Sequence, residues 1–392
     1  MRIAFFSETF LPVHDGVGHI VDDLSHALIR KGHEVTLYTT RNRGQPSEEV
    51  TPAGMRVHRL RSLPMPLYGQ YRWAIFPLRL AFSPSFGRSA DVVHLHTPYA
   101  LGSAGLFAAR HFRLPVVGTF HTDLLAMQVS FQGSVWARLA FPVGGFFSDG
   151  IYWRCDATTA PTAEAARSLM DRYTKPPHGP VVVVPNGVDT DRFRPDLDGS
   201  ELRSGLGGGD RPLVTFVGRL TRDKGVHVLL DAFAMLPKDL PFLGVIGGAG
   251  VEEEALRARV ASEKGLQGRV KVLGEVSEER KPALLAGSRI FVLPSIADTS
   301  SVSTLEAMAS GCACIVTNRG GPRNLVDPDR NGLLVDPQDA KEIAGAMARL
   351  LRDEALARRI GQEGRRYVID HASMDRAADT YLDLYRKIEP RP

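Results

Sequence analysis

The chain has 392 residues, of which 43% are hydrophobic and 23% are charged, and its net charge is +4. This length is too great for one ordinary hydrophobic core and predicts two domains, and the composition excludes disordered and membrane-embedded proteins. The apolar run at 139–147 is much shorter than the roughly 20 residues of a membrane-spanning helix. Ser7 and Glu8 interrupt the N-terminal apolar run too early for a signal peptide, so we expect a cytoplasmic protein that does not cross the membrane.

Short apolar runs alternate with amphipathic segments along the chain, a rhythm typical of strands and helices in a parallel sheet. In the first half the predicted strands are 3–6, 35–38, 57–60, 92–95, 116–119 and 181–184, and 18–30 is a predicted helix. In the second half the predicted strands are 213–217, 242–246, 270–273, 290–293 and 314–316, and the predicted helices are 226–235, 252–261 and 341–351. The sequence therefore predicts an α/β fold with two Rossmann-like, doubly wound parallel sheets.

A change of composition marks the predicted domain boundary. Residues 195–212 contain the run Gly207-Gly208-Gly209 and few large apolar side chains, which is typical of a linker. We therefore place an N-terminal domain at 1–194, the linker at 195–212 and a C-terminal domain at 213–372. Ligands of doubly wound sheets bind beyond the carboxyl ends of the strands, so we expect the chemistry in a cleft between the two domains.

The three cysteines, Cys155, Cys312 and Cys314, are too few for a disulfide framework and suit a reducing cytoplasm. Cys312-x-Cys314 has the form of half a metal site, but no second Cys or His pair lies near it in the sequence. Because Cys314 opens an apolar run, we interpret this pair as part of a buried strand and predict no metal site.

The excess positive charge lies entirely in the first half of the chain. Residues 1–190 contain 18 Arg or Lys against 14 Asp or Glu, whereas residues 191–392 contain 30 of each. This bias suits an anionic partner, either a phospholipid surface or an anionic acceptor, and a solvated basic face explains it equally well.

The strongest local signal follows the predicted strand at 290–293. A polar loop comes after Pro294-Ser295, and a helix begins near Val302 or Ser303. The loop and the start of the helix contain Asp298, Thr299, Ser300, Ser301 and Val302. Their backbone N–H groups would face a diphosphate, Asp298 can accept hydrogen bonds from sugar hydroxyls, and Glu306 can accept them from a ribose diol. The alternative is a routine strand–loop–helix unit whose acidic side chains face water.

In this region the sequence resembles the retaining glycosyltransferases of family 4, which have the GT-B fold of two Rossmann-like domains facing across a cleft. The resemblance rests on motifs that occur in the expected order over nearly the whole chain. They are Glu8-Thr9-Phe10-Leu11-Pro12 with Asp15-Gly16-Val17, Thr119-Phe120-His121-Thr122-Asp123, Pro185-Asn186-Gly187-Val188-Asp189, Phe216-Val217-Gly218-Arg219-Leu220 with Lys224-Gly225, Pro294-Ser295-x-x-Asp298 through Glu306 to Gly311, and Gly320-Gly321-Pro322. It implies transfer of a hexose from a UDP- or GDP-sugar to an acceptor hydroxyl, with retention of anomeric configuration. It also implies that the last helix, within 373–392, crosses back to the N-terminal domain.

Arg219 and Lys224 follow the predicted strand at 213–217 and match a pair of cations in the family. We expect them to bind the diphosphate and, as catalytic residues with Asp298 and His121, to stabilise the charge that builds as the diphosphate leaves. Two fixed cations make a divalent metal unnecessary, and we identify no Asp-x-Asp motif suited to holding one. No cofactor is therefore expected beyond the nucleotide-sugar substrate.

The resemblance also assigns residues around the donor sugar and the acceptor. It implies that His121 lies beside the donor sugar and faces the acceptor, with Asp123 orienting the imidazole and Asp15 contributing to the acceptor site. Gly16-Val17-Gly18 suggests the NAD fingerprint, but Val21 stands where that fingerprint needs its third glycine, which argues against NAD. In the resembled family, a glycine at Gly16 would let the backbone approach the donor. Gly247-Gly248-Ala249-Gly250 resembles the family's glycine turn near the nucleotide base, which makes Gly248 a candidate donor ligand, although a plain tight turn explains Ala249 equally well.

The chain departs from the family at Asp298, where most members have Glu. The shorter acid must bring its loop closer to the sugar or engage another hydroxyl, so the identity of the donor sugar stays open. Because His121 occupies the position that a nucleophilic carboxylate would need, we favour front-face substitution, in which the leaving phosphate helps to deprotonate the acceptor hydroxyl.

The acceptor is expected to bind to the N-terminal domain. Segments 68–86 and 131–153 are rich in aromatic side chains, which suits peripheral contact with lipid headgroups at the inner face of the membrane, although such residues also form ordinary cores. The acceptor is then a membrane lipid or, alternatively, a soluble sugar or natural product. A nucleotide-sugar epimerase and a non-catalytic nucleotide-sugar-binding protein are the rival functions, and no nucleic acid partner is expected.

Overall fold

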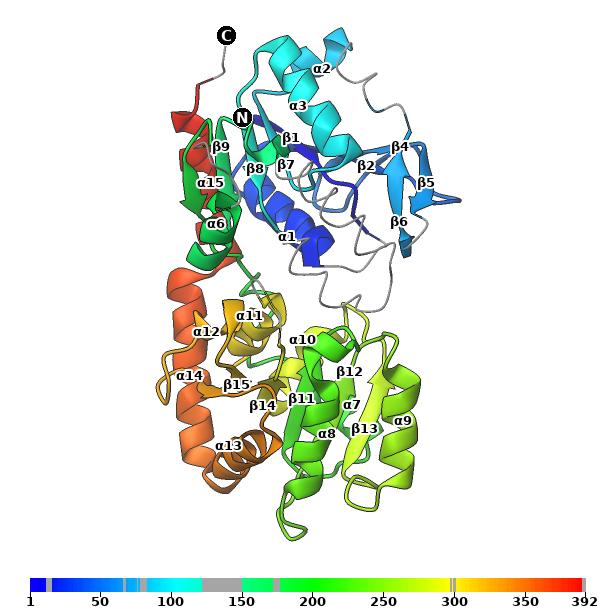
Figure 1. Cartoon of the computed structure of the whole chain (residues 1–392), viewed down its shortest axis with the longest axis vertical. Coiled ribbons are helices and arrows are strands. Elements are labelled where there is room, and N and C mark those ends of the chain that lie inside the picture. The colour runs from blue at the N-terminus through cyan, green and yellow to red at the C-terminus, as the bar shows by residue number, and fades with distance from the viewer. Residues whose placement is uncertain are drawn as a thin grey trace. The chain divides into compact units, whose positions relative to one another are not determined.

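The computed structural model divides the chain into two compact units, Met1–Gly187 with Met374–Pro392, and Val188–Ser373 (Figure 1). It describes residues 1–11, 16–65, 68–75, 77, 83–121, 150–171, 177–296, 298 and 301–389. Each unit has its own sheet and its own hydrophobic core, which is the predicted α/β class.

The first unit is built on an eight-stranded sheet in the order β10-β9-β8-β7-β1-β2-β4-β3. Neighbouring strands are parallel except for β3, which pairs antiparallel with β4 at one edge. The strands are β1 Arg2–Phe6, β2 Glu34–Thr40, β3 Glu48–Val50, β4 Arg56–Leu60, β7 Val92–Leu95, β8 Val116–Thr119, β9 Ala157–Ala160 and β10 Val181–Val183. The direction in which strands are added reverses beside β1, so the topological switch point lies between β1 and β7, with β8 as the next strand.

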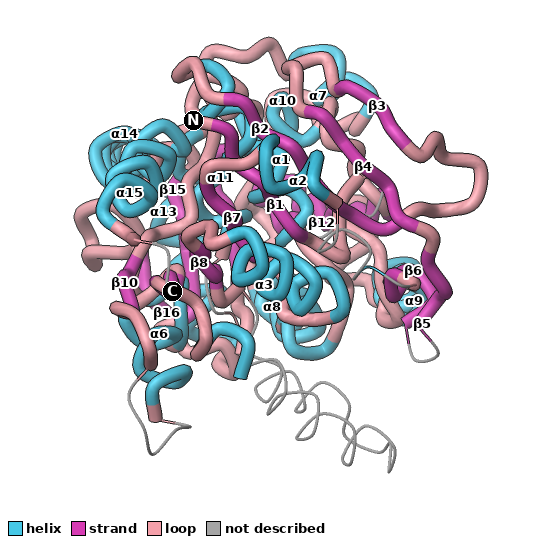
Figure 2. Tube along the Cα trace, turned by 90° about the horizontal axis from the view of Figure 1, so that it is seen from above, coloured by secondary structure: helices cyan, strands magenta, loops and turns pink. Residues whose placement is uncertain are grey.

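Alternating side chains of β1 supply two cores in the first unit. Ile3 and Phe5 pack in the core that includes helices α1 (Gly16–Arg30) and α15 (Met374–Lys387). Ala4 and Phe6 pack on the opposite face, with helix α3 (Ala100–Phe112). Figure 2 shows α1 and α3 beside the strands β1 and β7. The period of two along a strand explains this division, since successive side chains point to opposite faces.

Smaller elements complete the first unit. A two-stranded antiparallel hairpin, separate from the main sheet, follows β4. These elements are the hairpin strands β5 Ser62–Met65 and β6 Tyr68–Ala74 and the helices α2 Pro84–Ser89 and α6 Ala163–Met170. Leu63 and Trp73 face each other across the hairpin and are 61% and 49% exposed.

The second unit is built on a six-stranded parallel sheet in the order β13-β12-β11-β14-β15-β16. The strands are β11 Leu213–Val217, β12 Leu243–Gly247, β13 Val270–Gly274, β14 Ser288–Leu293, β15 Ala313–Thr317 and β16 Leu333–Val335. The helices are α7 Ser200–Gly205, α8 Val226–Met235, α9 Glu253–Ser262, α10 Lys281–Ala286, α11 Val302–Ala309, α12 Gly320–Arg323, α13 Ala340–Arg352 and α14 Glu354–His371, with the short 3-10 helix η3 Arg222–Lys224. This is the strand order of a Rossmann fold, and its switch point lies between β11 and β14.

The predicted linker at 195–212 differs from the structure, because the chain passes between the units at Gly187 and Val188 instead. The segment contains helix α7, and Arg203 on that helix donates to the Gly287 carbonyl at 3.1 Å. Leu206, just after the helix, belongs to the core of the second unit. Its glycines serve turns within that unit, so a composition typical of linkers was misleading here.

Cys312 and Cys314 are buried free thiols, and Cys314 lies within β15. The interpretation as a buried strand is therefore confirmed for Cys314, and Cys312 is buried directly before that strand. Burial raises the pKa of Cys312 to about 12, so its thiol is protonated at neutral pH.

Candidate active site

Two loops are clamped together at the carboxyl edge of the second sheet, one after β11 and one after β14. Gly225 has φ of +69°, and a Cβ at that position would lie 2.1 Å from the carbonyl oxygen of Pro294. The Asp223 carbonyl accepts hydrogen bonds from Ile296 N at 2.8 Å and Ser295 Oγ at 3.2 Å. Only glycine permits this approach, and it holds the first loop against the second at the switch point of the sheet.

The clamp brings together two of the predicted donor ligands, Lys224 and Asp298. Lys224 Nζ lies 2.8 Å from Asp298 Oδ2, and the two side chains are only 13% and 14% exposed. Asp298 Oδ1 accepts a hydrogen bond from Ser301 N at 3.0 Å. Ser301 caps the N-terminus of α11, where unpaired N–H groups and the helix dipole favour an anion. The Asp298 carboxylate thus contacts both a cation and a helix N-terminus, and these are the two groups that typically bind a phosphate.

The glycine turn after β12 lies against the loop that carries Arg219. Gly248 has φ of +140°, and a Cβ there would lie 1.8 Å from the Gly218 carbonyl oxygen. Gly218 N donates to the Gly247 carbonyl at 3.1 Å. Arg219 itself is exposed and forms no hydrogen bond or ion pair with any described residue. The positive charge of its guanidinium is therefore available to a ligand at this edge.

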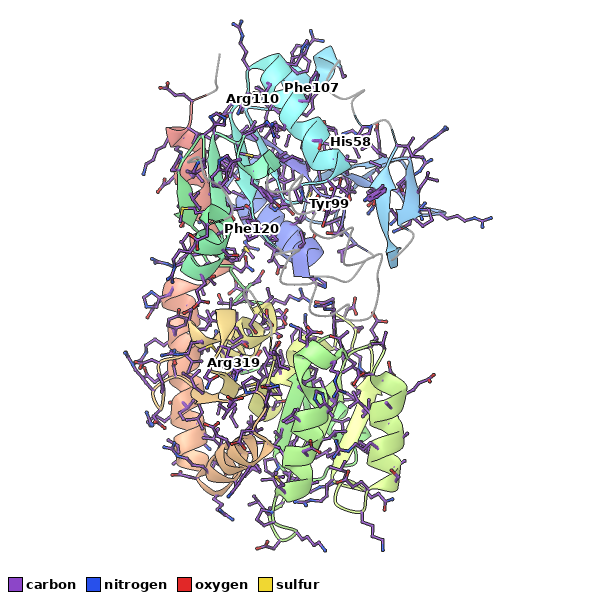
Figure 3. All side chains as sticks on the ribbon, viewed as in Figure 1. His58, Tyr99, Phe107, Arg110, Phe120 and Arg319 are labelled. Carbon is purple, nitrogen blue, oxygen red and sulfur yellow. The ribbon has the colours of Figure 1, made fainter. Side chains whose placement is uncertain are left out.

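The motif Gly320-Gly321 holds the backbone of Asp298. Gly321 N donates to the Asp298 carbonyl at 2.8 Å, and a Cβ on Gly320, where φ is +63°, would lie 2.7 Å from the same oxygen. The preceding residue, Arg319, forms an ion pair with Asp336 at 2.9 Å and is labelled in Figure 3. Loops after β11, β12, β14 and β15 therefore converge on one end of the sheet.

Glu306 is buried on α11 and has a partner that the sequence did not predict. Lys281 Nζ lies 2.7 Å from Glu306 Oε1 and 3.0 Å from Glu278 Oε1, and Arg192 continues the network to Glu278 at 2.5 Å. Burial raises the pKa of Glu306, and Lys281 opposes that rise. Burial also lowers the pKa of Lys281, but the two carboxylates outweigh it and leave that pKa above its usual value.

The role of Lys281 was missed because it lies 25 positions before Glu306 and begins a short helix with no motif around it. The only signal in the sequence is a lysine beside a short apolar run, Pro282-Ala283-Leu284-Leu285, before the predicted strand at 290–293. Lone lysines of that kind are usually solvated, so the signal is weak.

In the first unit, Glu8 lies at the end of β1 and is 4% exposed. Its carboxylate accepts a hydrogen bond from Leu101 N, near the start of α3, and a short one from Thr97 Oγ1. Burial raises the pKa of Glu8 to about 7, and these hydrogen bonds partly oppose that rise. Glu8 begins the motif Glu8-Thr9-Phe10-Leu11-Pro12, but the sequence did not predict a role for it.

His121 follows β8 and forms a buried cluster with two other histidines. His94 lies within β7, and His96 directly follows it. His121 Nε2 lies 3.0 Å from His96 Nδ1, with the rings stacked at 5.3 Å. His94 binds Thr119 Oγ1 at 2.6 Å and Tyr385 of α15 at 2.7 Å. Burial lowers the pKa of all three imidazoles, that of His121 to about 4, so His121 is neutral at pH 7.

The backbone around His121 is fixed by its neighbours. Phe120, labelled in Figure 3, is 1% exposed and meets Tyr152 edge to face at 5.7 Å. Phe120 N donates to the Thr159 carbonyl at 2.8 Å. The strand end therefore cannot rotate without disrupting this packing, which fixes the backbone directly before His121.

The remaining predicted site residues divide into two groups. Asp15, Asp123, Thr299 and Ser300 lie outside the described residues. Gly16 begins α1 and is exposed, and a Cβ there would meet no described atom within 4 Å, so its proposed closeness to a donor stays a prediction. Val302 begins α11 directly after Ser301.

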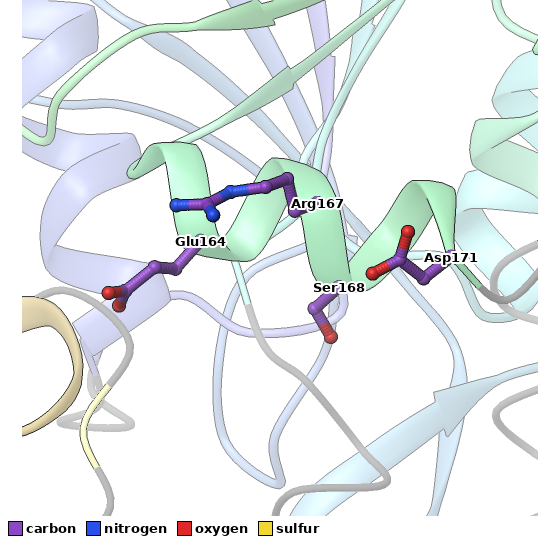
Figure 4. Close-up of a pocket in the computed structure, with 4 residues that line it drawn as sticks. All are labelled: Glu164, Arg167, Ser168 and Asp171. Carbon is purple, nitrogen blue, oxygen red and sulfur yellow. The ribbon is translucent and has the colours of Figure 1, made fainter.

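A surface pocket lies elsewhere, along one side of α6. Glu164, Arg167, Ser168 and Asp171 line it (Figure 4). All four residues belong to one short helical segment, and none of them is a predicted ligand, so this pocket is not the candidate site. Among the described residues, no three His, Cys, Asp or Glu side chains gather as metal ligands, and no helix is long and apolar enough to span a membrane.

Comparison with known families matches both halves of the chain. The family described as Glycosyltransferase Family 4 matches residues 14–192, and Glycosyl transferases group 1 matches residues 201–367. A GDP-mannose-dependent alpha-mannosyltransferase of Mycolicibacterium smegmatis is 34% identical over 372 residues, covering 94% of this chain and 93% of that protein. The chain belongs to the family 4, group 1 glycosyltransferases.

The chain is also similar to one further sequence relative and to one solved structure. The alpha-monoglucosyldiacylglycerol synthase of Streptococcus pneumoniae is 26% identical, covering 90% of this chain and 78% of that protein. The Anabaena protein HepE, solved with UDP and glucose, superposes with a TM-score of 0.78 at 18% identity over 99% of this chain and 100% of that one. The second likeness supports the GT-B fold alone.

Proposed function

We propose that this glycosyltransferase moves a hexose from a UDP- or GDP-sugar to an acceptor hydroxyl, with retention of configuration and without a metal ion. The observation that carries the proposal is the contact of Asp298 with Lys224 and with the N-terminus of α11 at the switch point of the second sheet. Arg219 is exposed and follows the same strand, β11, as Lys224. This edge offers two cations and a helix N-terminus to a diphosphate.

The electrostatics of the edge favour departure of the diphosphate. Negative charge builds on the leaving phosphate as the sugar is transferred, so fixed cations stabilise the transition state more than the ground state. Arg219 is exposed and unpaired among the described residues, and Lys224 is held in place by Asp298. Glu306, which forms an ion pair with Lys281, is proposed to accept hydrogen bonds from the ribose hydroxyls.

The neutral state of His121 limits the role that this side chain can have in the reaction. An imidazole with a pKa near 4 is a poor acid and a poor base at pH 7, but it can hydrogen-bond a sugar hydroxyl. We therefore propose that His121 orients the sugar and that the leaving phosphate oxygen takes the proton of the acceptor hydroxyl in a front-face substitution. Trapping a covalent glycosyl-enzyme would contradict this mechanism.

The relatives suggest donors and acceptors to test first. The mycobacterial relative is named for GDP-mannose, which makes GDP-mannose the first donor to test, with UDP-glucose second. The streptococcal relative is named for a glucosylated diacylglycerol, which supports a lipid acceptor. The excess of positive over negative charge in the first half of the sequence suits an anionic lipid surface as well. A soluble sugar acceptor is the alternative.

The test is release of nucleoside diphosphate from UDP-, GDP- and ADP-sugars in the presence of EDTA, with and without vesicles of anionic lipid. We expect one donor to be turned over, and Lys224→Met to lower kcat by about 100-fold or more. Lys264→Met, at an exposed position of the same unit, is the matched control and should leave kcat unchanged.

The outcomes separate the proposed function from its rivals. Release that rises with lipid supports a glycolipid-forming transferase, and release that lipid does not change redirects the search to soluble acceptors. Conversion of the donor sugar to an epimer without acceptor would identify an epimerase. Binding without turnover of any donor would contradict the catalytic proposal.

A further inference from the structure

The buried pair His96 and His121 has two nitrogen atoms that bind no residue of the part of the chain that the structure describes. His96 Nδ1 and His121 Nε2 face each other at 3.0 Å. The outer nitrogens, His96 Nε2 and His121 Nδ1, are buried and have no hydrogen-bond partner among the described residues. Buried polar atoms normally form hydrogen bonds, so two neighbouring imidazoles that each have one unbonded ring nitrogen need an explanation.

The shared hydrogen bond links the states of the two outer nitrogens. A neutral imidazole carries one N–H and one lone pair, so only one of the two facing nitrogens carries hydrogen. If His121 Nε2 donates, His121 Nδ1 is an acceptor and His96 Nε2 carries the unpaired N–H. If His96 Nδ1 donates, His121 Nδ1 carries the N–H and His96 Nε2 is the acceptor.

Burial decides between these two arrangements. His96 is 1% exposed, whereas His121 is 9% exposed and lies at the end of its strand. An orphaned buried N–H is rarer and costlier than a carbonyl or imine nitrogen left without a donor. Both outer nitrogens are buried in the ligand-free protein. The N–H therefore belongs on the less buried residue, His121, which lies at the end of its strand where we propose that the sugar binds, and the unpaired acceptor belongs on His96.

The ring of His96 is held by neighbours that cannot supply its missing partner. Phe5 packs against it edge-on at 4.6 Å, and the ring of His94 lies 4.1 Å away. Both nitrogens of His94 are already engaged, by Tyr385 and by Thr119. His96 is therefore fixed in place, with Nδ1 directed at His121.

We propose that His96 is a positioning residue that donates from Nδ1 to His121 Nε2 and so holds His121 as the Nδ1–H tautomer, which donates a hydrogen bond to a sugar hydroxyl oxygen. This inference rests on the proposed function only for the identity of the ligand. The tautomer itself is a property of the ligand-free protein. It adds to the proposed role of His121 the direction in which its hydrogen bond runs.

The direct test is nitrogen-15 NMR of histidine-labelled full-length protein at pH 7, where the two neutral tautomers give distinct pairs of ring nitrogen shifts. We expect His121 to be the Nδ1–H tautomer in the wild type. His96→Phe keeps a ring against Phe5 but has no donor, and His121 should then lose that tautomer. His96→Asn places an amide donor at the position of Nδ1 and should keep it.

Assignment and folding are controlled within the same experiment. His121→Gln identifies the His121 signals, and His111→Asn, at an exposed position on α3, should change no other histidine signal. Circular dichroism and thermal unfolding of His96→Phe and His96→Asn show whether both variants fold. If His96→Phe does not fold, the comparison of wild type with His96→Asn still reports the tautomer.

Kinetics provide the second readout. His96→Phe should lower kcat about 10- to 100-fold with the donor KM little changed, and His96→Asn should stay within about threefold of the wild type. An Nε2–H tautomer of His121 in the wild type would overturn the proposal, and so would an unchanged tautomer in folded His96→Phe. Absence of transferase activity would contradict the proposed function but would leave the tautomer result standing.

Discussion

Asp298 stands where the sequence resemblance leads us to expect a Glu, and the structure gives the short side chain two contacts. Its carboxylate binds Lys224 Nζ at 2.8 Å and Ser301 N at 3.0 Å. Both contacts are groups that a diphosphate would also use. Without donor, Asp298 therefore neutralises the proposed anion site, and a donor must share or displace it.

This contact predicts opposite effects on binding and on turnover. Asp298→Asn removes the negative charge that competes for Lys224, so affinity for the free nucleoside diphosphate should not fall and should rise severalfold. Turnover should fall about 100-fold, because the sugar loses a charged acceptor. Calorimetry with UDP and GDP and the diphosphate-release assay measure the two effects. Asp239→Asn, exposed in the same unit, is the control, and a parallel loss of binding and turnover would contradict the competition.

Glu8 predicts a pH-dependent stability of the first unit. Its pKa rises from 4.5 to about 7 on folding, so the folded state binds the proton more tightly than the unfolded state does. The stability gained from the protonated form is complete below about pH 4.5 and is lost as the pH rises through 7. This difference corresponds to about 3 kcal/mol. The buried histidines act in the opposite sense, because their lowered pKa values reduce stability as the pH falls below about 6.5.

The variant Glu8→Gln isolates the contribution of Glu8, because the histidines are common to both proteins. Relative to the wild type, its free energy of unfolding should rise between pH 5 and pH 8. Denaturant unfolding across this range measures the difference, and Glu164→Gln, exposed on α6, should show none. A wild-type minus Glu8→Gln difference that does not vary with pH would show that Glu8 is ionised in the folded protein throughout.

At the scale of elements, Gly225 holds the loops after β11 and β14 together at the edge of the second sheet where we propose that the donor binds. A Cβ at this position would meet the Pro294 carbonyl at 2.1 Å, so Gly225→Ala must separate the loops after β11 and β14. We expect loss of diphosphate binding by tenfold or more, because Lys224 moves away from α11. Gly209→Ala is a matched control, since Gly209 also has a positive φ of +57° but open space around it.

Gly209→Ala should cost about 1 kcal/mol of stability from its backbone conformation and leave binding intact. Equal binding losses in the two variants would show that backbone strain, and not the contact with Pro294, is responsible. Thermal unfolding and calorimetry on both proteins distinguish these cases.

The elements that the sequence predicted are those with large apolar side chains. β11, with the sequence Leu-Val-Thr-Phe-Val, was predicted with the bounds that the structure has. β9 was missed because Ala-Thr-Thr-Ala gives little hydrophobic signal, and β16 because it has only three residues. Parallel strands buried on both faces are found by continuous hydrophobicity, and a strand of small residues lacks it.

Site residues were predicted where a motif follows the end of a predicted strand. Residues that join the site only through contacts with parts of the chain distant in sequence were missed. Lys224 and Asp298 were singled out from motifs 74 residues apart, but their ion pair depends on how β11 and β14 pair. Lys281 and His96 contact predicted residues through tertiary packing alone. Two histidines on alternate positions at the end of an apolar strand were the only sequence signal for the histidine cluster.

At the scale of the whole molecule, the chain contributes to the first unit twice. It enters the second unit at Val188 and leaves it at Ser373, and these two residues form an isolated parallel bridge. The last helix, α15, then packs on α1 and supplies Tyr385 to His94 in the first unit. The C-terminus is therefore part of the core that supports His121, although it lies more than 250 residues away in the sequence.

The central claim is that the second unit binds the nucleoside diphosphate of the donor at the switch point of its sheet. A crystal structure of the full chain with the diphosphate selected by the release assay tests it most directly. We predict the diphosphate on Arg219, Lys224 and the N-terminus of α11, with the ribose hydroxyls at Glu306. A diphosphate bound elsewhere, with Lys224 still paired to Asp298 and Glu306 to Lys281, would contradict it.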